Sequence, residues 1–181
     1  ADMVSGVPDS GLEAAYGYSL ESGIPYGAAF VKNRYVGRSF IVPNQAGRER
    51  TVNVKLNPLK ASVKGKRIIL VDDSIVRGTT SARIIRSLRD AGAKEVHLCI
   101  SCPPFKYPCY FGTDIDSRDK LIANKYTIEG IREKLGADSL VYLDLEELLA
   151  IKPAGLEYCH GCFTGKYPIE VGEASKDQFD D

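Results

Sequence analysis

The sequence has no excess of charge of either sign. Its 181 residues include 24 lysines and arginines and 24 aspartates and glutamates, so the formal net charge is zero. A neutral chain argues against a general nucleic-acid binder. No apolar run approaches the roughly 20 residues of a membrane span, and no signal-peptide pattern opens the chain. We therefore expect a cytoplasmic protein with no membrane and no nucleic-acid partner.

Other absences narrow the function further. The nucleotide-binding patterns G-x-G-x-x-G and G-x-x-x-x-G-K do not occur, which argues against a Rossmann-like nucleotide binder. Cysteine is absent from the first 98 residues, and the five that follow are an odd number. In a reducing compartment such cysteines suggest metal chemistry rather than disulfides. His97 falls within an apolar strand pattern, so we expect it to be structural and not catalytic.

Positive charge is concentrated in one segment of this neutral chain. Between Lys32 and Lys60 seven basic residues face one acidic residue, Glu49, which gives a local charge of +6. A cationic segment in a neutral protein indicates a local anionic ligand.

The stretch from Arg67 to Ser81 combines a buried strand with an anion-binding loop. The apolar run Ile68–Val71 ends in two carboxylates, Asp72 and Asp73, and a polar loop then leads into a helical pattern. The start of a helix offers free N–H groups and the positive end of the helix dipole. Two adjacent carboxylates beside such a cradle suggest a ligand with a phosphate, sugar hydroxyls and Mg²⁺.

Strand and helix patterns alternate along the chain. This order indicates an α/β fold with a doubly wound parallel sheet, whose ligand lies beyond the carboxyl ends of the strands. We expect residues 51–59 to form a short helix and residues 60–66 to form a connecting loop.

Four motifs together resemble one family. They are Val7–Gly11 (VPDSG), Tyr35–Ile41 (YVGRSFI), Val71–Ser81 (VDDSIVRGTTS) and Cys159–Cys162 (CHGC). Each is similar to a motif of the type I phosphoribosyltransferases, in the form found in the glutamine phosphoribosyl-pyrophosphate (PRPP) amidotransferase family, and the order is the same. The resemblance covers most of the chain and implies the type I phosphoribosyltransferase fold.

The resemblance assigns roles to the substrate site. Asp72 and Asp73 are expected to bind ribose hydroxyls and Mg²⁺, and Ser10 is expected to lie near the pyrophosphate and the metal. For Ser10, a simple helix cap is an equally good interpretation of the turn. The residues expected to hold the 5′-phosphate are Ser74, Ile75, Val76, Arg77, Gly78, Thr79, Thr80 and Ser81.

Residues 34–50 fit neither a helical nor a strand period, and long irregular loops are often functional. In the resembled family this loop is flexible and closes over the substrate. Arg38, Gln45 and Arg48 would then reach the pyrophosphate, with Arg38 and Arg48 counted among the catalytic residues. The alternative is an antiparallel hairpin with a solvated basic face.

Two cysteines two residues apart, Cys159 and Cys162, commonly share a metal. Some members of the resembled family use such a pair, a cysteine like Cys109 and one further cysteine to hold a structural [4Fe–4S] cluster. The further cysteine would lie upstream of residue 1, so the expected cluster is lost or incomplete in this chain. The alternative is a reduced knuckle without metal.

The resemblance implies an enzyme, a glycosyltransferase of purine biosynthesis. It would transfer the phosphoribosyl group of PRPP to ammonia, giving 5-phosphoribosylamine and pyrophosphate. The family's glutaminase domain uses an N-terminal cysteine, whereas this chain begins with Ala1. We therefore expect only the transferase part (residues 1–152), followed by a cysteine-containing extension with an acidic tail (residues 153–181). Such a fragment could be inactive without the rest of the protein.

The expected partners are PRPP, ammonia, the glutaminase domain of the full-length protein, purine nucleotides as inhibitors, and further copies in a homo-oligomer. Two alternatives remain open at this point. One is a non-catalytic PRPP-binding regulatory module, which would tolerate loss of the basic loop. The other is a nucleobase phosphoribosyltransferase, which would need a base-recognition hood that we do not find in the sequence.

Overall fold

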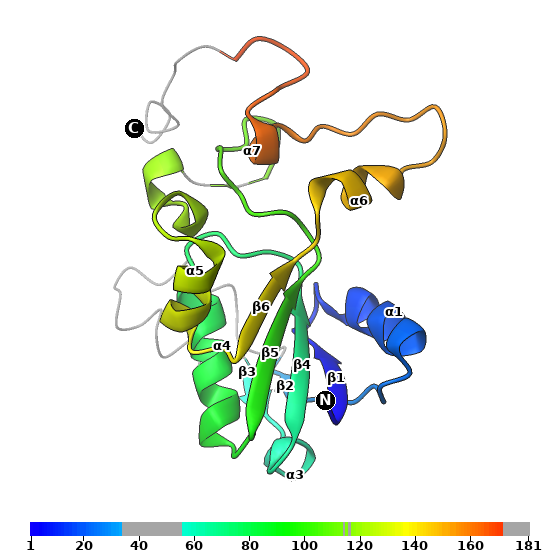
Figure 1. The fold of residues 1–181 in the computed structure, drawn as a ribbon, viewed down its shortest axis with the longest axis vertical. Coiled ribbons are helices and arrows are strands. Elements are labelled where there is room, and N and C mark those ends of the chain that lie inside the picture. Colours follow the sequence, from blue (N-terminus) through cyan, green and yellow to red (C-terminus); the bar gives the residue numbers. More distant parts are fainter. Residues whose placement is uncertain (34–55, 114, 116, 172–181) are drawn as a thin grey trace.

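A four-stranded parallel sheet forms the centre of the computed structural model (Figure 1). The structure describes residues 1–33, 56–113, 115 and 117–171. The strands lie in the order β1-β4-β5-β6, and their bounds are β1 Met3–Gly6, β4 Arg67–Asp72, β5 Glu95–Ile100 and β6 Ser139–Tyr142. A separate antiparallel pair is formed by β2 Phe30–Lys32 and β3 Leu56–Pro58. Because all four central strands run in one direction, their carboxyl ends share one edge.

Helices cover both faces of the sheet (Figure 1). The helix α1 (Leu12–Ser22) packs on one face against β1 and β4, and α4 (Thr79–Asp90) and α5 (Ile128–Leu135) pack on the other. The remaining elements are short: α3 Lys60–Val63, η2 Arg118–Lys120, η3 Ile122–Asn124, α6 Leu145–Ala150 and α7 Gly161–Thr164. This arrangement confirms the predicted doubly wound α/β fold. Within the described part of the chain, no helix is long and apolar enough to cross a membrane.

The sequence explains why the central elements form. In β4 the residues Ile68–Val71 are all buried, as expected for a parallel strand covered on both faces. The buried side chains of α4 recur at the spacing of one helical face; they are Ser81, Ile84, Ile85 and Leu88. The helix α5 begins at the cap Thr127, whose hydroxyl accepts a hydrogen bond from the Gly130 N–H at 3.1 Å.

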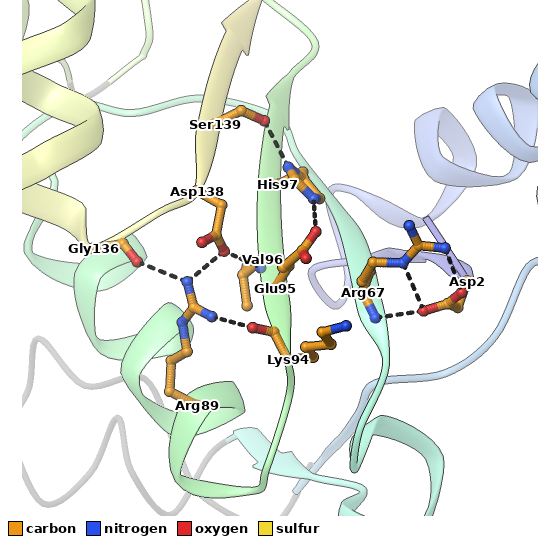
Figure 2. Close-up of polar contacts among 10 residues, drawn as sticks. All are labelled: Asp2, Arg67, Arg89, Lys94, Glu95, Val96, His97, Gly136, Asp138 and Ser139. Atoms are coloured by element: carbon orange, nitrogen blue, oxygen red, sulfur yellow. Dashed lines mark hydrogen bonds and ion pairs between the residues drawn. The ribbon is translucent and has the colours of Figure 1, made fainter.

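Charged contacts fix the amino ends of the strands, at the edge opposite the carboxylate pair (Figure 2). Arg67 donates to both carboxylate oxygens of Asp2, which ties β4 to the start of β1. Asp138 accepts from the Arg89 guanidinium and, at 2.6 Å, from the Val96 N–H. His97 lies between Ser139 and Glu95, at 2.9 Å from Ser139 Oγ and 3.1 Å from Glu95 Oε2. These contacts place His97 away from the ligand edge, in agreement with a structural role.

Two local predictions were wrong. Residues 51–59 were predicted as a helix, but Leu56–Pro58 forms the strand β3, which pairs with Phe30–Lys32. Residues 51–55 lie outside the described part. Residues 60–66 contain the short helix α3, which buries Val63 completely. In both places a tertiary contact outweighs the local pattern of the sequence.

Strand β5 lies between β4 and β6 and buries every second side chain in the core. We expect Leu98→Ala to lower the free energy of unfolding by about 2–5 kcal/mol, because Leu98 is fully buried and its truncation leaves a cavity. Val141→Ala on β6 is the matched control, since Val141 is 58% exposed and its truncation should cost about 0.5 kcal/mol or less. Denaturant unfolding of both variants measures the difference. Equal losses would contradict this account of the core.

Candidate functional site

The topology of the sheet indicates where along its carboxyl edge a ligand would bind. After β1 the chain crosses to one face of the sheet through α1, and after β4 it crosses to the other face through α4. The carboxyl ends of β1 and β4 therefore flank the point at which the winding direction reverses. In open α/β sheets ligands bind in the crevice at this point. Both predicted loops, Val7–Gly11 and Asp72–Ser81, begin there.

The turn after β1 rests directly on the end of β4. The Val7 N–H donates to the Val71 carbonyl at 2.8 Å. A Cβ atom at Gly11 would lie 2.3 Å from the same carbonyl oxygen and 3.1 Å from the Asp72 Cα, so only glycine fits here. This contact brings the exposed Ser10 next to the backbone of Asp72. No side chain caps α1, whose N-cap is Gly11, so the alternative interpretation of Ser10 as a helix cap is wrong.

The two carboxylates at the end of β4 have different environments. Asp72 is 7% exposed, whereas Asp73 is exposed. Burial, followed by the negative charge of Asp73, raises the pKa of Asp72 to about 7. The Asp73 N–H donates to Asp72 Oδ1 at 3.0 Å, and the Ser101 N–H donates to the Asp72 carbonyl at 3.0 Å. The chain thus holds a buried acid directly beside a second acid.

The loop that follows wraps around the start of α4. The helix begins at Thr79, because Gly78 adopts φ +79° and turns the chain into the helix. Thr79, Thr80 and Ser81 therefore lie in the first helical turn, where backbone N–H groups have no partner within the helix. Ser81 is buried, and Thr79 and Thr80 are exposed. The other residues expected to hold the phosphate, Ser74, Ile75, Val76 and Arg77, form the turn that precedes Gly78.

A second layer of contacts supports this loop from behind. The Ile122 N–H donates to the Val76 carbonyl at 2.9 Å, and Ile75 is buried in the main core. A Cβ at Gly78 would lie 2.6 Å from Ile122 Cδ1 and 3.2 Å from Leu135 Cδ2, so the loop packs closely on η3 and α5. The loop is therefore held in place by its packing against the rest of the fold. Arg38, Gln45 and Arg48, predicted for the same site, lie outside the described residues.

The C-terminal cysteines approach the segment that follows β5. The Lys106 and Tyr107 N–H groups both donate to the Cys162 carbonyl at 3.0 Å, and Phe163 stacks on Phe105 with the ring centres 5.2 Å apart. Burial, followed by the charge of Cys109, raises the pKa of Cys162 to about 11. Burial also acts to raise the pKa of Cys109, but backbone hydrogen bonds from residues 111–113 lower it overall.

These contacts place Cys109, Cys159 and Cys162 in one region of the structure. Over the described ranges, however, no three cysteine, histidine or acidic side chains are arranged to hold a metal. Cys159 is exposed, while Cys109 and Cys162 are partly buried. As they lie here, the three thiols do not form a metal site.

The other two thiols are closer to the carboxylates but unreactive. Burial is the main cause that raises the pKa of Cys102 to about 12, and the charges of Asp73, Cys162 and Asp72 add to it. Burial also raises the pKa of Cys99. A thiol held in its protonated form is a poor nucleophile. The raised pKa values therefore argue against a nucleophilic role for Cys99 and Cys102.

Sequence reasoning missed two features of the site. The close approach of Gly11 to β4 was not foreseen, although the glycine of the Val7–Gly11 turn was the available signal. The support of the loop by Ile122 and Leu135 was also missed, because both residues come from elements more than forty positions downstream. No local pattern in the sequence connects them to Gly78.

Comparison with known proteins supports the motif resemblance. The family model of the phosphoribosyl transferase domain matches residues 1–122. The chain is 55% identical over 175 residues to an amidophosphoribosyltransferase of Synechocystis sp., covering 96% of this chain and 35% of that protein. It is 56% identical over 174 residues to that of Archaeoglobus fulgidus, covering 94% of this chain and 38% of that protein. The chain thus spans well under half the length of these curated relatives.

A solved structure gives the same result. The glutamine PRPP amidotransferase from B. subtilis, in complex with ADP and GMP, superposes with a TM-score of 0.83 at 49% sequence identity. The match covers 97% of this chain and 40% of that chain. At this identity the likeness extends to the sequence as well as to the fold, from the first strand to the C-terminal cysteines.

The buried carboxyl of Asp72 should make stability depend on pH. Its folded pKa, about 7, lies above the ordinary value of 3.8, so its contribution is fully present below about pH 4 and is lost as pH rises through 7. We expect Asp72→Asn to stabilise the protein at pH 8 by an amount on the order of 2 kcal/mol, and to have little effect at pH 4.

Chemical denaturation at both pH values measures this difference. Asp73→Asn is the comparison, since Asp73 is exposed and should gain less from loss of its own charge. An Asp72→Asn variant that is less stable than wild type at pH 8 would contradict the assignment of Asp72 as a buried, strained acid.

Proposed function

Because this chain belongs to the phosphoribosyl transferase domain family, we propose that it transfers the 5-phosphoribosyl group of PRPP to ammonia, giving 5-phosphoribosylamine and pyrophosphate. The observation that carries the proposal is the pairing of Asp72 and Asp73 with an anion-binding helix start at the switch point of the sheet. The choice of ammonia rests on the similarity to amidophosphoribosyltransferases. The reaction would be the first step of de novo purine synthesis.

Different residues of the site would bind the 5′-phosphate and the ribose. The 5′-phosphate lies against the Ser74–Ser81 loop, where the N–H groups of the first turn of α4 and the Thr79 and Thr80 hydroxyls donate to its oxygens. The carboxylates of Asp72 and Asp73 accept hydrogen bonds from the ribose hydroxyls and so orient the sugar. These contacts hold the anomeric carbon in place for attack, which lowers the entropic part of the barrier.

The bond changes need no protein nucleophile. The bond between the anomeric carbon and the pyrophosphate oxygen breaks, and its electron pair leaves with pyrophosphate. The lone pair of neutral ammonia forms the new carbon–nitrogen bond, and the nitrogen then gives one proton to solvent. Arg38, Gln45 and Arg48, which lie outside the described residues, are proposed to bind the departing pyrophosphate, as the motif resemblance implies. The same segment is proposed to exclude water.

The carboxylate pair also fits a divalent cation. Two acids that repel one another, one buried and one exposed, form the oxygen donor set that Mg²⁺ prefers, and Ser10 on the adjacent turn adds a hydroxyl. A bound Mg²⁺ would neutralise charge on the pyrophosphate oxygens. Its charge would also favour the ionised form of Asp72, which burial otherwise disfavours.

The wider context of the reaction is also a proposal. We infer that a glutaminase domain of the full-length protein supplies the ammonia, because the chain spans only 35–38% of the relatives named above. Purine nucleotides are candidate inhibitors, since ADP and GMP accompany the related B. subtilis structure. Assembly into a homo-oligomer belongs to the same proposal.

Turnover of PRPP tests the function directly. With Mg²⁺ and ammonium salt, we expect pyrophosphate release at a rate that increases with pH, because only unprotonated ammonia attacks. Glutamine, adenine and orotate should not replace ammonium. The variant Asp72→Asn/Asp73→Asn should lose at least about 100-fold in kcat/KM, roughly 3 kcal/mol of transition-state stabilisation, while remaining folded.

Asp90→Asn, at the far end of α4, is the matched control and should keep wild-type turnover. Release with adenine or orotate would instead indicate a nucleobase transferase. PRPP binding with no release under any condition would indicate a non-catalytic module. Unchanged turnover in the double variant would refute the role of the carboxylates.

The iron–sulfur assignment stays a prediction. If Cys109, Cys159 and Cys162 rearrange to bind a cluster, protein prepared without oxygen should contain iron and acid-labile sulfide in equal amounts, and Cys159→Ser should lose both. Cys99→Ser is the control, since Cys99 lies in β5. Zinc in place of iron would refute the cluster, whereas no metal at all is the result expected if the missing fourth ligand prevents assembly in this chain.

A further inference from the structure

The hydroxyl group of Tyr142, at the end of β6, is buried without a hydrogen-bond partner among the described residues. Within the part of the chain that the structure describes, it is the only buried side-chain nitrogen or oxygen in this condition. A tyrosine hydroxyl in a protein interior normally finds a partner, because a buried polar group that is left alone lowers stability. The exception therefore requires a physical explanation.

Tyr142 lies in the same row of the sheet as Asp72. The parallel register pairs Asp72 with Ile100 and Ile100 with Tyr142, so the three side chains lie on one face of the sheet at its carboxyl edge. Ile100 belongs to the main core on that face, and Tyr142 packs against the same core. This is the face that α4 and α5 cover. The Tyr142 ring is therefore at the edge that carries the candidate site, on the side where α4 begins.

Cys102 lies between this ring and the acid pair. Burial, followed by the charge of Cys102, raises the pKa of Tyr142, so the two side chains are close together. Burial and then the charge of Asp73 raise the pKa of Cys102 in turn. The Cys102 thiol donates to the Pro103 carbonyl at 3.2 Å, so its proton is already used. The Tyr142 hydroxyl thus keeps its own proton, close to the carboxylates, with no acceptor for it among the described residues.

We propose that Tyr142 is a positioning residue of the substrate site, whose hydroxyl gains its hydrogen bond when PRPP and Mg²⁺ bind. In the bound state it donates to an oxygen of the turn formed by Asp73 and Ser74, the part of this edge that a bound cation and phosphate would displace. The hydrogen bond then holds the turn in its ligand-bound position. This inference rests on the PRPP binding that the proposed function requires, and not on the choice of ammonia.

The free and the bound protein should respond in opposite ways to removal of the hydroxyl. In the free protein, Tyr142→Phe deletes a buried polar group that has no partner, so stability should be unchanged or higher. In the bound protein the same substitution deletes a hydrogen bond, so PRPP should bind the variant less tightly. A purely structural hydroxyl would show the reverse: its loss would lower the stability of the free protein and leave the affinity for PRPP unchanged.

The test uses the whole 181-residue chain, the Tyr142→Phe variant and a Tyr18→Phe control. Tyr18 is 40% exposed on α1, which covers the opposite face of the sheet. Denaturant unfolding without ligand should give Tyr142→Phe a midpoint equal to or above that of wild type. Calorimetric titration with PRPP and Mg²⁺ should show about fivefold weaker binding for Tyr142→Phe, the loss expected for one hydrogen bond, and an affinity within about twofold of wild type for the control.

Ultraviolet absorption reports the hydrogen bond itself. The chain has ten tyrosines and no tryptophan, so tyrosine dominates its absorption near 280 nm. A phenol that begins to donate a hydrogen bond absorbs at longer wavelength, and PRPP does not absorb in this range. We expect PRPP and Mg²⁺ to produce a shift to longer wavelength in wild type and in Tyr18→Phe, and a smaller shift in Tyr142→Phe.

Several results would overturn the inference. A free Tyr142→Phe protein that is less stable than wild type shows that a bound water or another group already satisfies the hydroxyl. Equal affinity for PRPP, or an equal spectral shift, in wild type and Tyr142→Phe shows that binding does not engage it. If wild type does not bind PRPP, the proposed function fails and the positioning role fails with it. If PRPP binds but is not transferred to ammonia, only the proposed reaction fails.

Discussion

The contact between Gly11 and the end of β4 holds the two halves of the site together. The turn after β1 and the carboxylates after β4 belong to different crossover units, and the backbone of each packs on the other with no side chain between them. The close approach holds the backbone of Gly11, the residue after Ser10, against the backbone of Val71 and Asp72. A side chain at position 11 would separate them. The architecture of the site thus depends on a residue that has no functional group of its own.

The end of β4 also shows why the site lowers the stability of the fold. The hydrophobic core surrounds residues Ile68–Val71 of β4, and the strand carries Asp72 into the protein with them. Burial and the adjacent Asp73 both oppose its ionisation, and its pKa of about 7 is the result. A fold selected for stability alone would place an amide or an apolar residue here. Under the proposed function, Mg²⁺ and the ribose hydroxyls of the substrate would compensate this buried acid.

The sequence predicted this part of the molecule well because its signals are local. An apolar run, two acids, a glycine and a helical pattern follow one another within 25 residues, and β4, the loop and α4 form in that order. Leu56–Pro58 was predicted as helix because its strand partner, Phe30–Lys32, lies more than twenty residues away. A surface depression lined by Arg77, Lys125 and Lys134 was not predicted, for a related reason: these residues come from three separate segments and meet only in the folded chain.

The phosphate loop is held from two further directions, which explains how distant segments bear on it. Ile122 and Leu135 close one side, beside Gly78. On the other side Val76 packs into a small cluster around Phe105, Ile115 and Leu121, and this cluster includes Cys162 and Phe163 of α7. Cys162 and Phe163 therefore connect to the loop through a continuous apolar contact that includes Val76. The C-terminal segment thus helps to support the candidate site, and the loop cannot be understood from its own residues alone.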